Sequence, residues 1–164
     1  TRRRALPPLR EFKEIAVTRF RRRFAALIVL LAGALAPVTA GAHSAEVEGV
    51  KIGHAWAPPA EGDGAAVYMP ILNDRDEAVS LVSASTPIAE RVRLRETDDG
   101  AATFYSSLKL APGQPVSLAE WRVHLWLDGL NRDLEVGDTF PLTVTFEPGG
   151  SVELEIYVEE SPGH

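Results

Sequence analysis

Four histidines are the side chains of this 164-residue sequence best suited to chemistry: His43, His54, His124 and His164. Neutral imidazole is a common ligand of transition metals, so these residues are candidate metal ligands. The sequence has no cysteine and a single methionine, Met69, which leaves few sulfur ligands. It also lacks a nucleophile elbow, a P-loop and a glycine-rich dinucleotide loop. We therefore predict a protein that is not an enzyme.

His43 follows Ala40-Gly41-Ala42, where small residues satisfy the cleavage rule of a signal peptidase at two positions. Cleavage after Ala42 would make His43 the first residue, and its α-amine and imidazole would chelate one metal ion together. Cleavage after Ala40 would leave Gly41-Ala42-His43, whose amine, two backbone nitrogens and imidazole can form a square-planar set. Tetragonal nitrogen ligands favour Cu(II) or Ni(II), so both cuts predict copper. Otherwise, His43 is merely the residue that follows the cleavage site.

The two internal histidines are the further candidate ligands. His124 shares a predicted strand face with Trp126 and Asp128, so it is either a ligand supported by a nearby carboxylate or a surface histidine. His54 shares a face with Trp56 on another predicted strand. We expect His54 to lie at the edge of the core with a hydrogen bond, unless it joins a metal site.

Residues 19–42 have the order of a secretory signal peptide: a basic start, an apolar run over 25–36 and small residues before the cut. The run is shorter than the roughly 20 apolar residues that span a bilayer. We expect the ordinary export route, although Arg22-Arg23 weakly resembles a twin-arginine signal. Residues 1–18 form a leader, with Val17 an alternative start. The expected product is a periplasmic or secreted domain over 43–160 with a tail over 161–164, free of the membrane after cleavage.

Charge excludes one class of partner. Residues 43–164 contain 8 Lys/Arg and 21 Asp/Glu, a formal net charge of −13. Nucleic acid binding needs a basic surface, so we expect cations or basic protein surfaces as partners, and a monomer without disulfides. Arg91, Arg93 and Arg95 form a basic stripe on one predicted strand face. We expect this stripe to be solvated and paired with carboxylates, with a docking site as the alternative.

Alternating apolar and polar residues over 140–146 and 152–158 predict two strands, and Pro148-Gly149-Gly150 predicts the turn of their hairpin. Other short strands are expected over 50–56, 66–72, 79–84, 91–95, 103–110 and 122–127. About eight short strands separated by turns indicate an all-β sandwich or barrel. Pro70 within its run predicts an edge strand or a bulge, and we expect the three tryptophans to lie in the core.

Several segments, in this order, resemble the periplasmic copper chaperones of the PCu(A)C family. The resemblance covers roughly residues 47–158. It rests on Ala55-Trp56-Ala57, Gly64-Ala65-Ala66-Val67-Tyr68, Leu81-Val82-Ser83-Ala84-Ser85-Thr86-Pro87, Leu110-Ala111-Pro112-Gly113, His124-Leu125-Trp126-Leu127-Asp128-Gly129-Leu130 and Leu134-Glu135-Val136-Gly137-Asp138-Thr139-Phe140-Pro141-Leu142.

This resemblance implies a cupredoxin-like, or immunoglobulin-like, β-sandwich that carries Cu(I) and delivers it towards cytochrome oxidase assembly. The family's site resembles a His, a later Met and a His-x-Met, because thioethers and imidazoles suit Cu(I). In this sequence those positions hold Arg95, then Ala102 or Thr103, then His124 and Trp126. One ligand of four is present, so the resemblance implies a family site that no longer binds copper.

Three functions follow from these observations. The first is a periplasmic copper-binding, chaperone-like protein that holds copper through His43 with help from His54 or His124. The second is a metal-free interaction module that docks an oxidase assembly protein or another copper carrier through the arginine stripe or the acidic surface. The third is an oxidative copper enzyme with an N-terminal histidine brace, which would need His54 or His124 close to His43.

Overall fold

The computed structural model describes residues 44–161, and these residues form strands and loops without helices. The predicted all-β class is therefore confirmed. The signal peptide, His43 and His164 lie outside the described residues. Across residues 44–161 no helix has the length and apolarity needed to cross a membrane.

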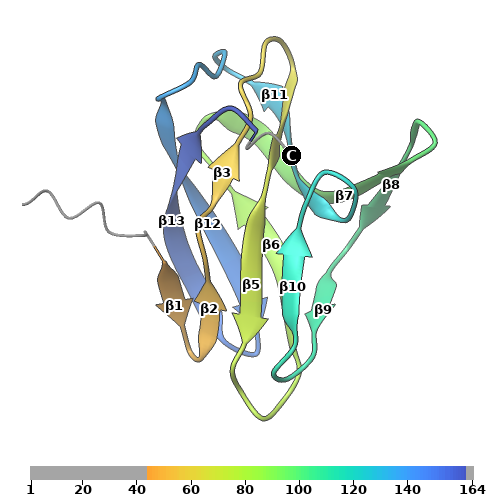
Figure 1. Ribbon diagram of the computed structural model, residues 1–164, viewed down its shortest axis with the longest axis vertical. Helices are drawn as coiled ribbons and strands as arrows, with labels where there is room; N and C mark the ends of the chain where they lie inside the picture. Colours follow the sequence, from red (N-terminus) through yellow and green to blue (C-terminus); the bar gives the residue numbers. More distant parts are fainter. Residues whose placement is uncertain (1–43, 162–164) are drawn as a thin grey trace, which may run out of the picture. The chain divides into compact units, whose positions relative to one another are not determined.

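Three sheets make up the domain (Figure 1). The first has the order β1 (Ala45–Val47), β2 (Val50–Ile52), β5 (Met69–Asn73) and β10 (Pro115–Leu118). The second has the order β3 (Trp56–Ala57), β13 (Gly150–Val158), β12 (Thr139–Glu147), β6 (Val79–Ser85) and β9 (Leu108–Leu110). The third has the order β4 (Gly64–Val67), β11 (His124–Leu130), β7 (Ala89–Asp98) and β8 (Ala101–Tyr105). Figure 1 shows the first sheet in front of the second, which gives the two layers of a sandwich.

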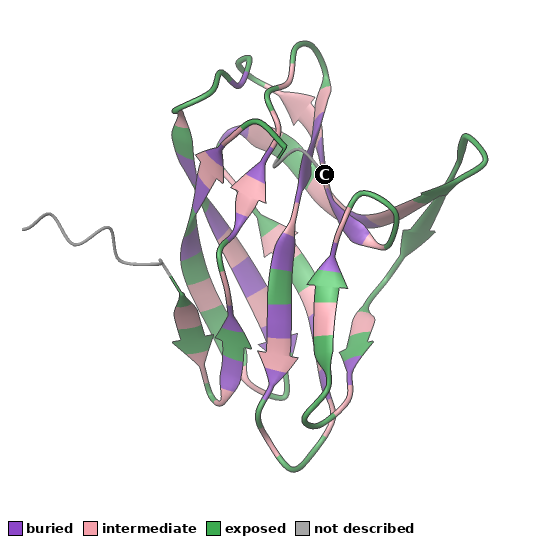
Figure 2. Cartoon of the chain, viewed as in Figure 1, coloured by how far each residue is buried: buried purple, intermediate pink, exposed green. Residues whose placement is uncertain are grey.

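The β12–β13 hairpin is the longest pairing of the second sheet, and it confirms the prediction from alternation. Leu142 lies opposite Leu154, and Phe140 lies opposite Ile156. All four side chains are buried, whereas their neighbours Pro141 and the glutamates of β13 are exposed (Figure 2). Because successive side chains of a strand point to opposite faces, the apolar positions place one face of the hairpin in the core.

The prediction of about eight strands was wrong: residues 44–161 contain thirteen. Three expected strands are each divided because the chain changes sheet in the middle of the run. The 50–56 run gives β2 in the first sheet and β3 in the second, and 103–110 gives β8 in the third and β9 in the second. The 66–72 run likewise gives β4 and β5. A strand that switches sheets must bend and leave its hydrogen-bonded ladder, so periodicity alone does not reveal the break.

The expectation of an edge strand or bulge at Pro70 was also wrong. β5 lies inside the first sheet, between β2 and β10, and its register with β10 is regular, with Pro70 opposite Ser117. Pro70 lies one residue beyond the last β2–β5 pair, Ile52 with Ile71. Its carbonyl accepts a hydrogen bond from Gly53 N–H at 2.9 Å. Proline lacks the N–H that would donate back to the Gly53 carbonyl, so the β2–β5 ladder ends at Pro70.

Candidate metal centre

The β11–β7 pairing places the expected family site on one face of the third sheet. His124 begins β11 and lies opposite Arg95 of β7, and Trp126 lies opposite Arg93. Directly opposed residues of antiparallel strands point to the same face, as do residues two apart. The four side chains therefore share one face.

His124 has the hydrogen bond of a ligand-ready imidazole. Its side chain is buried at 5% exposure, and Nδ1 lies 2.9 Å from the carbonyl oxygen of Arg122. A carbonyl only accepts, so Nδ1 carries the proton and Nε2 keeps its lone pair. Among residues 44–161, Nε2 has no hydrogen-bond partner, and the Tyr68 ring packs edge-on at 5.7 Å. This tautomer is the one that a metal-ligating histidine has.

Arg95 brings a permanent positive charge to the same face. Its guanidinium carbon lies 4.0 Å from the centre of a Trp126 ring, in a cation–π contact, and its Nε is buried without a partner in the described part of the chain. Arginine is always charged. A singly charged metal ion about 4 Å from the guanidinium would be repelled by about 4 kcal/mol at an effective dielectric of 20. The Trp126 indole thus holds the cation of a neighbouring side chain.

Gly64 of β4 makes room for this indole. A Cβ atom at residue 64 would lie 2.4 Å from Cζ2 and 2.9 Å from Cε2 of Trp126. Such distances are too short for any real contact, so the ring must move when a methyl group is added. Gly64, Trp126 and Arg95 therefore form one packed unit.

We expect Gly64→Ala to lower the free energy of unfolding by about 1–3 kcal/mol, because overpacking a filled site forces neighbouring side chains out of place. Urea unfolding measures this loss. Gly149→Ala is the matched control, since its added Cβ would come no closer than 3.4 Å to a neighbouring atom. Equal stability of the two variants would contradict the packing of Trp126 against Gly64.

Asp128 connects the arginine stripe to the same indole. Arg93 Nε and Nη2 donate to its two carboxylate oxygens at 2.6 and 3.0 Å, and Trp126 Nε1 donates to Oδ1 at 3.1 Å. The Arg93 guanidinium also lies 3.6 Å from the centre of the Phe104 ring. The expected pairing with carboxylates is confirmed at Arg93, whereas Arg95 packs on an indole. The hydrogen bonds from Arg93 lower the pKa of Asp128.

This lowered pKa predicts an acid-dependent loss of stability. The contribution of Asp128 is complete above the pKa of an unfolded aspartate, about 3.9, and is lost as the pH falls through the lower native pKa. We expect Asp128→Asn to cost about 1–3 kcal/mol at neutral pH, and the cost to shrink in acid. Urea unfolding between pH 2 and 7 measures it, with Asp98→Asn, an exposed residue of β7, as the control. A cost that does not change with pH would contradict the pairing.

His54 has different partners from His124. It lies in the loop between β2 and β3, where Nε2 is 3.1 Å from both carboxylate oxygens of Glu159 and the ring stacks on Tyr157 at 5.7 Å. The predicted hydrogen bond is confirmed, but the side chain is 45% exposed rather than at the core edge. His54 and His124 therefore contact different residues. His43 and His164 lie outside the described residues.

Strand register distinguishes the two positions that the family's lone Met was expected to match. Ala102 of β8 lies opposite Thr97, whereas Thr103 lies opposite Glu96. Because Thr97 is two residues from Arg95, Ala102 shares the face of Arg95 and Trp126, and Thr103 points to the other face.

Met69, in β5, is buried in a different sheet. The described residues, 44–161, contain no group of three His, Cys, Asp or Glu side chains that could hold a metal ion.

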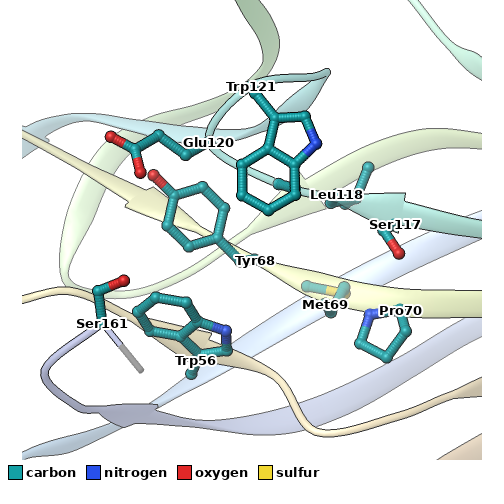
Figure 3. Close-up of a pocket in the computed structure, with 10 residues that line it drawn as sticks. Trp56, Tyr68, Met69, Pro70, Ser117, Leu118, Glu120, Trp121 and Ser161 are labelled. Atoms are coloured by element: carbon teal, nitrogen blue, oxygen red, sulfur yellow. The ribbon is translucent and has the colours of Figure 1, made fainter. Parts of the chain in front are cut away.

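A pocket of about 300 Å³ lies beside this face, and sequence reasoning missed it. Its walls include Trp56, Tyr68 and Trp121, with Met69 buried beneath (Figure 3). The expectation that all three tryptophans lie in the core was wrong, since Trp121 is 68% exposed and Trp56 is partly exposed. The signal that was available is the position of Trp121 between two charged residues, Glu120 and Arg122, which is unlike a core strand.

Comparisons with known proteins identify the family of this chain. The family model described as LpqE-like matches residues 50–158. A chain from Leifsonia xyli subsp. xyli (strain CTCB07), named lipoprotein Lxx21020, is 26% identical over 132 residues, or 77% of this chain and 80% of that one.

Two solved structures have the same fold. The copper-bound PCuAC domain from PmoF2 is 26% identical with a TM-score of 0.65, and the match covers 73% of this chain and 99% of that domain. The solution structure of CuI-DR1885 from Deinococcus radiodurans is 27% identical with a TM-score of 0.57, and the match covers 77% and 87% of the two chains. The chain therefore belongs to the LpqE-like family and has the β-sandwich fold of the PCuAC copper-binding domains.

Proposed function

We propose that this protein is an exported copper-handling protein that binds Cu(II) through nitrogen ligands at its mature N-terminus, while its PCuAC site carries no copper. The absence of copper from the PCuAC site is supported by Arg95, whose guanidinium carbon lies 4.0 Å from the centre of a Trp126 ring. Copper as the cargo is supported by the family and by two related structures described as copper-bound and as CuI.

His54 is the internal ligand that best complements His43. Its Nε2 faces the Glu159 carboxylate, so this nitrogen carries the proton and Nδ1 keeps a lone pair for a metal ion. A carboxylate behind a ligating histidine fixes the ring and raises its basicity. His124 has no such carboxylate on its ring and shares its face with Arg95.

Titration of the exported protein, with its native N-terminus, against Cu(II) and Cu(I) tests this function. We expect one Cu(II) ion to bind well below millimolar concentration and Cu(I) to bind far more weakly. No binding of either ion tighter than about 1 mM, an affinity of only about 4 kcal/mol, would overturn the proposal. Its natural partners would be other copper carriers or cytochrome oxidase assembly proteins of the same compartment.

A metal-free interaction module is the second candidate function. It is favoured by the side chains at the family's ligand positions, because Arg95 packs on Trp126 and Trp126 packs against Gly64, which leaves a filled surface rather than an open site. In this case the exported protein would bind neither copper ion, yet would still capture a copper carrier. Loss of that capture when Arg91, Arg93 and Arg95 become Ser would assign it to the arginine stripe.

A further inference from the structure

The pocket beside the β11–β7 face is built from three separate parts of the chain. Trp56 comes from β3, Tyr68 from the link between β4 and β5, and Trp121 from the loop between β10 and β11. Figure 3 shows the two indoles on either side of the Tyr68 ring. The rings of Trp56 and Tyr68 have centres 5.0 Å apart and planes inclined by 57°. Inclined aromatic faces form a concave wall rather than a flat stack.

The lining is mostly apolar, with a single charged group. Met69 and Leu118 are both buried and close the pocket on its inner side. Glu120 is the only charged residue among those that line it. At about 300 Å³ the pocket is at the lower end of the range for small-molecule sites, which have this composition of aromatic walls and a few polar groups.

Charge favours a cation as the occupant. The face of an aromatic ring is negative, and several rings around one site attract a positive ligand within about 6 Å of their centres. Glu120 adds a full negative charge. Burial, and after it the charge of Glu120, raises the pKa of Tyr68. Arg95 acts on Tyr68 in the opposite sense, but its guanidinium is held over Trp126 and does not line the pocket.

The small number of acceptors favours a quaternary ammonium over a primary one. Besides Glu120, the side-chain oxygen acceptors that line the pocket are the hydroxyls of Tyr68, Ser117 and Ser161. A primary ammonium brings three N–H donors that would lose water, whereas a quaternary ammonium has none and is wrapped in methyl groups. We propose that this pocket binds a small, freely dissolved quaternary alkylammonium ion, with Trp56, Tyr68 and Trp121 as its cage and Glu120 as its counter-ion.

Choline and 3,3-dimethylbutan-1-ol test this proposal, because the second is the uncharged carbon analogue of the first. Calorimetric titration of the exported protein should show choline binding about tenfold tighter than its neutral analogue. Glu120→Gln should weaken choline without weakening the analogue. Equal binding of the two compounds, or binding of neither, would overturn the proposal.

Two variants assign the site. Trp121→Leu should lower choline affinity about tenfold, and it alters an exposed loop side chain, so the fold should survive. Tyr105→Leu removes an exposed ring of β8 that does not line the pocket, and it should leave choline affinity unchanged. A choline affinity that falls in Tyr105→Leu but not in Trp121→Leu would contradict the assignment. Binding of the protein to phosphatidylcholine vesicles that free choline does not displace would also contradict it. None of these results depends on copper, so they are independent of the proposed function.

Discussion

The triple variant Arg95→His, Ala102→Met and Trp126→Met is expected to gain Cu(I) affinity of about 1,000-fold or more over the wild-type protein, equivalent to about 4 kcal/mol. It removes a fixed positive charge and supplies two thioethers and a second imidazole, the ligands that Cu(I) prefers. His124 already has its Nδ1 bound to a carbonyl, which leaves Nε2 for the metal. Competition with a Cu(I) chelator measures the gain.

Strand register provides the control for this variant. Replacing Ala102→Met by Thr103→Met supplies the same thioether from the other face of β8, because Thr103 lies opposite Glu96 rather than Thr97. We expect most of the gain to disappear in this version. Equal Cu(I) affinity of the two triple variants would show that the site is not where the third sheet places it.

His43→Ala is expected to lower Cu(II) affinity about 100-fold or more, because it removes the imidazole that completes the nitrogen set. His54→Ala should cost about tenfold, as the loss of one supporting ligand. Isothermal titration of the exported protein with Cu(II) measures both effects.

His124→Ala is the matched control, because His124 lies beside Arg95 and is paired with it in register. We expect its Cu(II) affinity to equal that of the wild-type protein. A loss at His124 that equals the loss at His43 would place copper on the third sheet and contradict the N-terminal site.

Periodicity predicted the fold class because the apolar positions of the long hairpin alternate without interruption. Phe140, Leu142 and Leu154 are buried as their spacing predicts. It failed where the chain changes sheet, as between Ile52 and Trp56, because the apolar pattern continues while the hydrogen-bonded partner changes. Long-range pairing determines those breaks, and a single sequence does not display it.

The candidate site was predicted in part. The resemblance implied that Arg95 and Trp126 stand at ligand positions, but the contact between the two side chains depends on the β7–β11 register. The space for the indole depends on Gly64 in β4, far away in the sequence. The aromatic pocket was missed for the same reason, because Trp56, Tyr68 and Trp121 come from three distant segments.

Native mass spectrometry of the protein recovered from the exported compartment in copper-containing medium tests the central claim most directly, because it gives the first residue and the bound metal together. We predict a chain that begins at Gly41 or His43 and carries one copper ion. A chain that begins elsewhere, or one that begins there and stays metal-free, would contradict copper binding at the mature N-terminus.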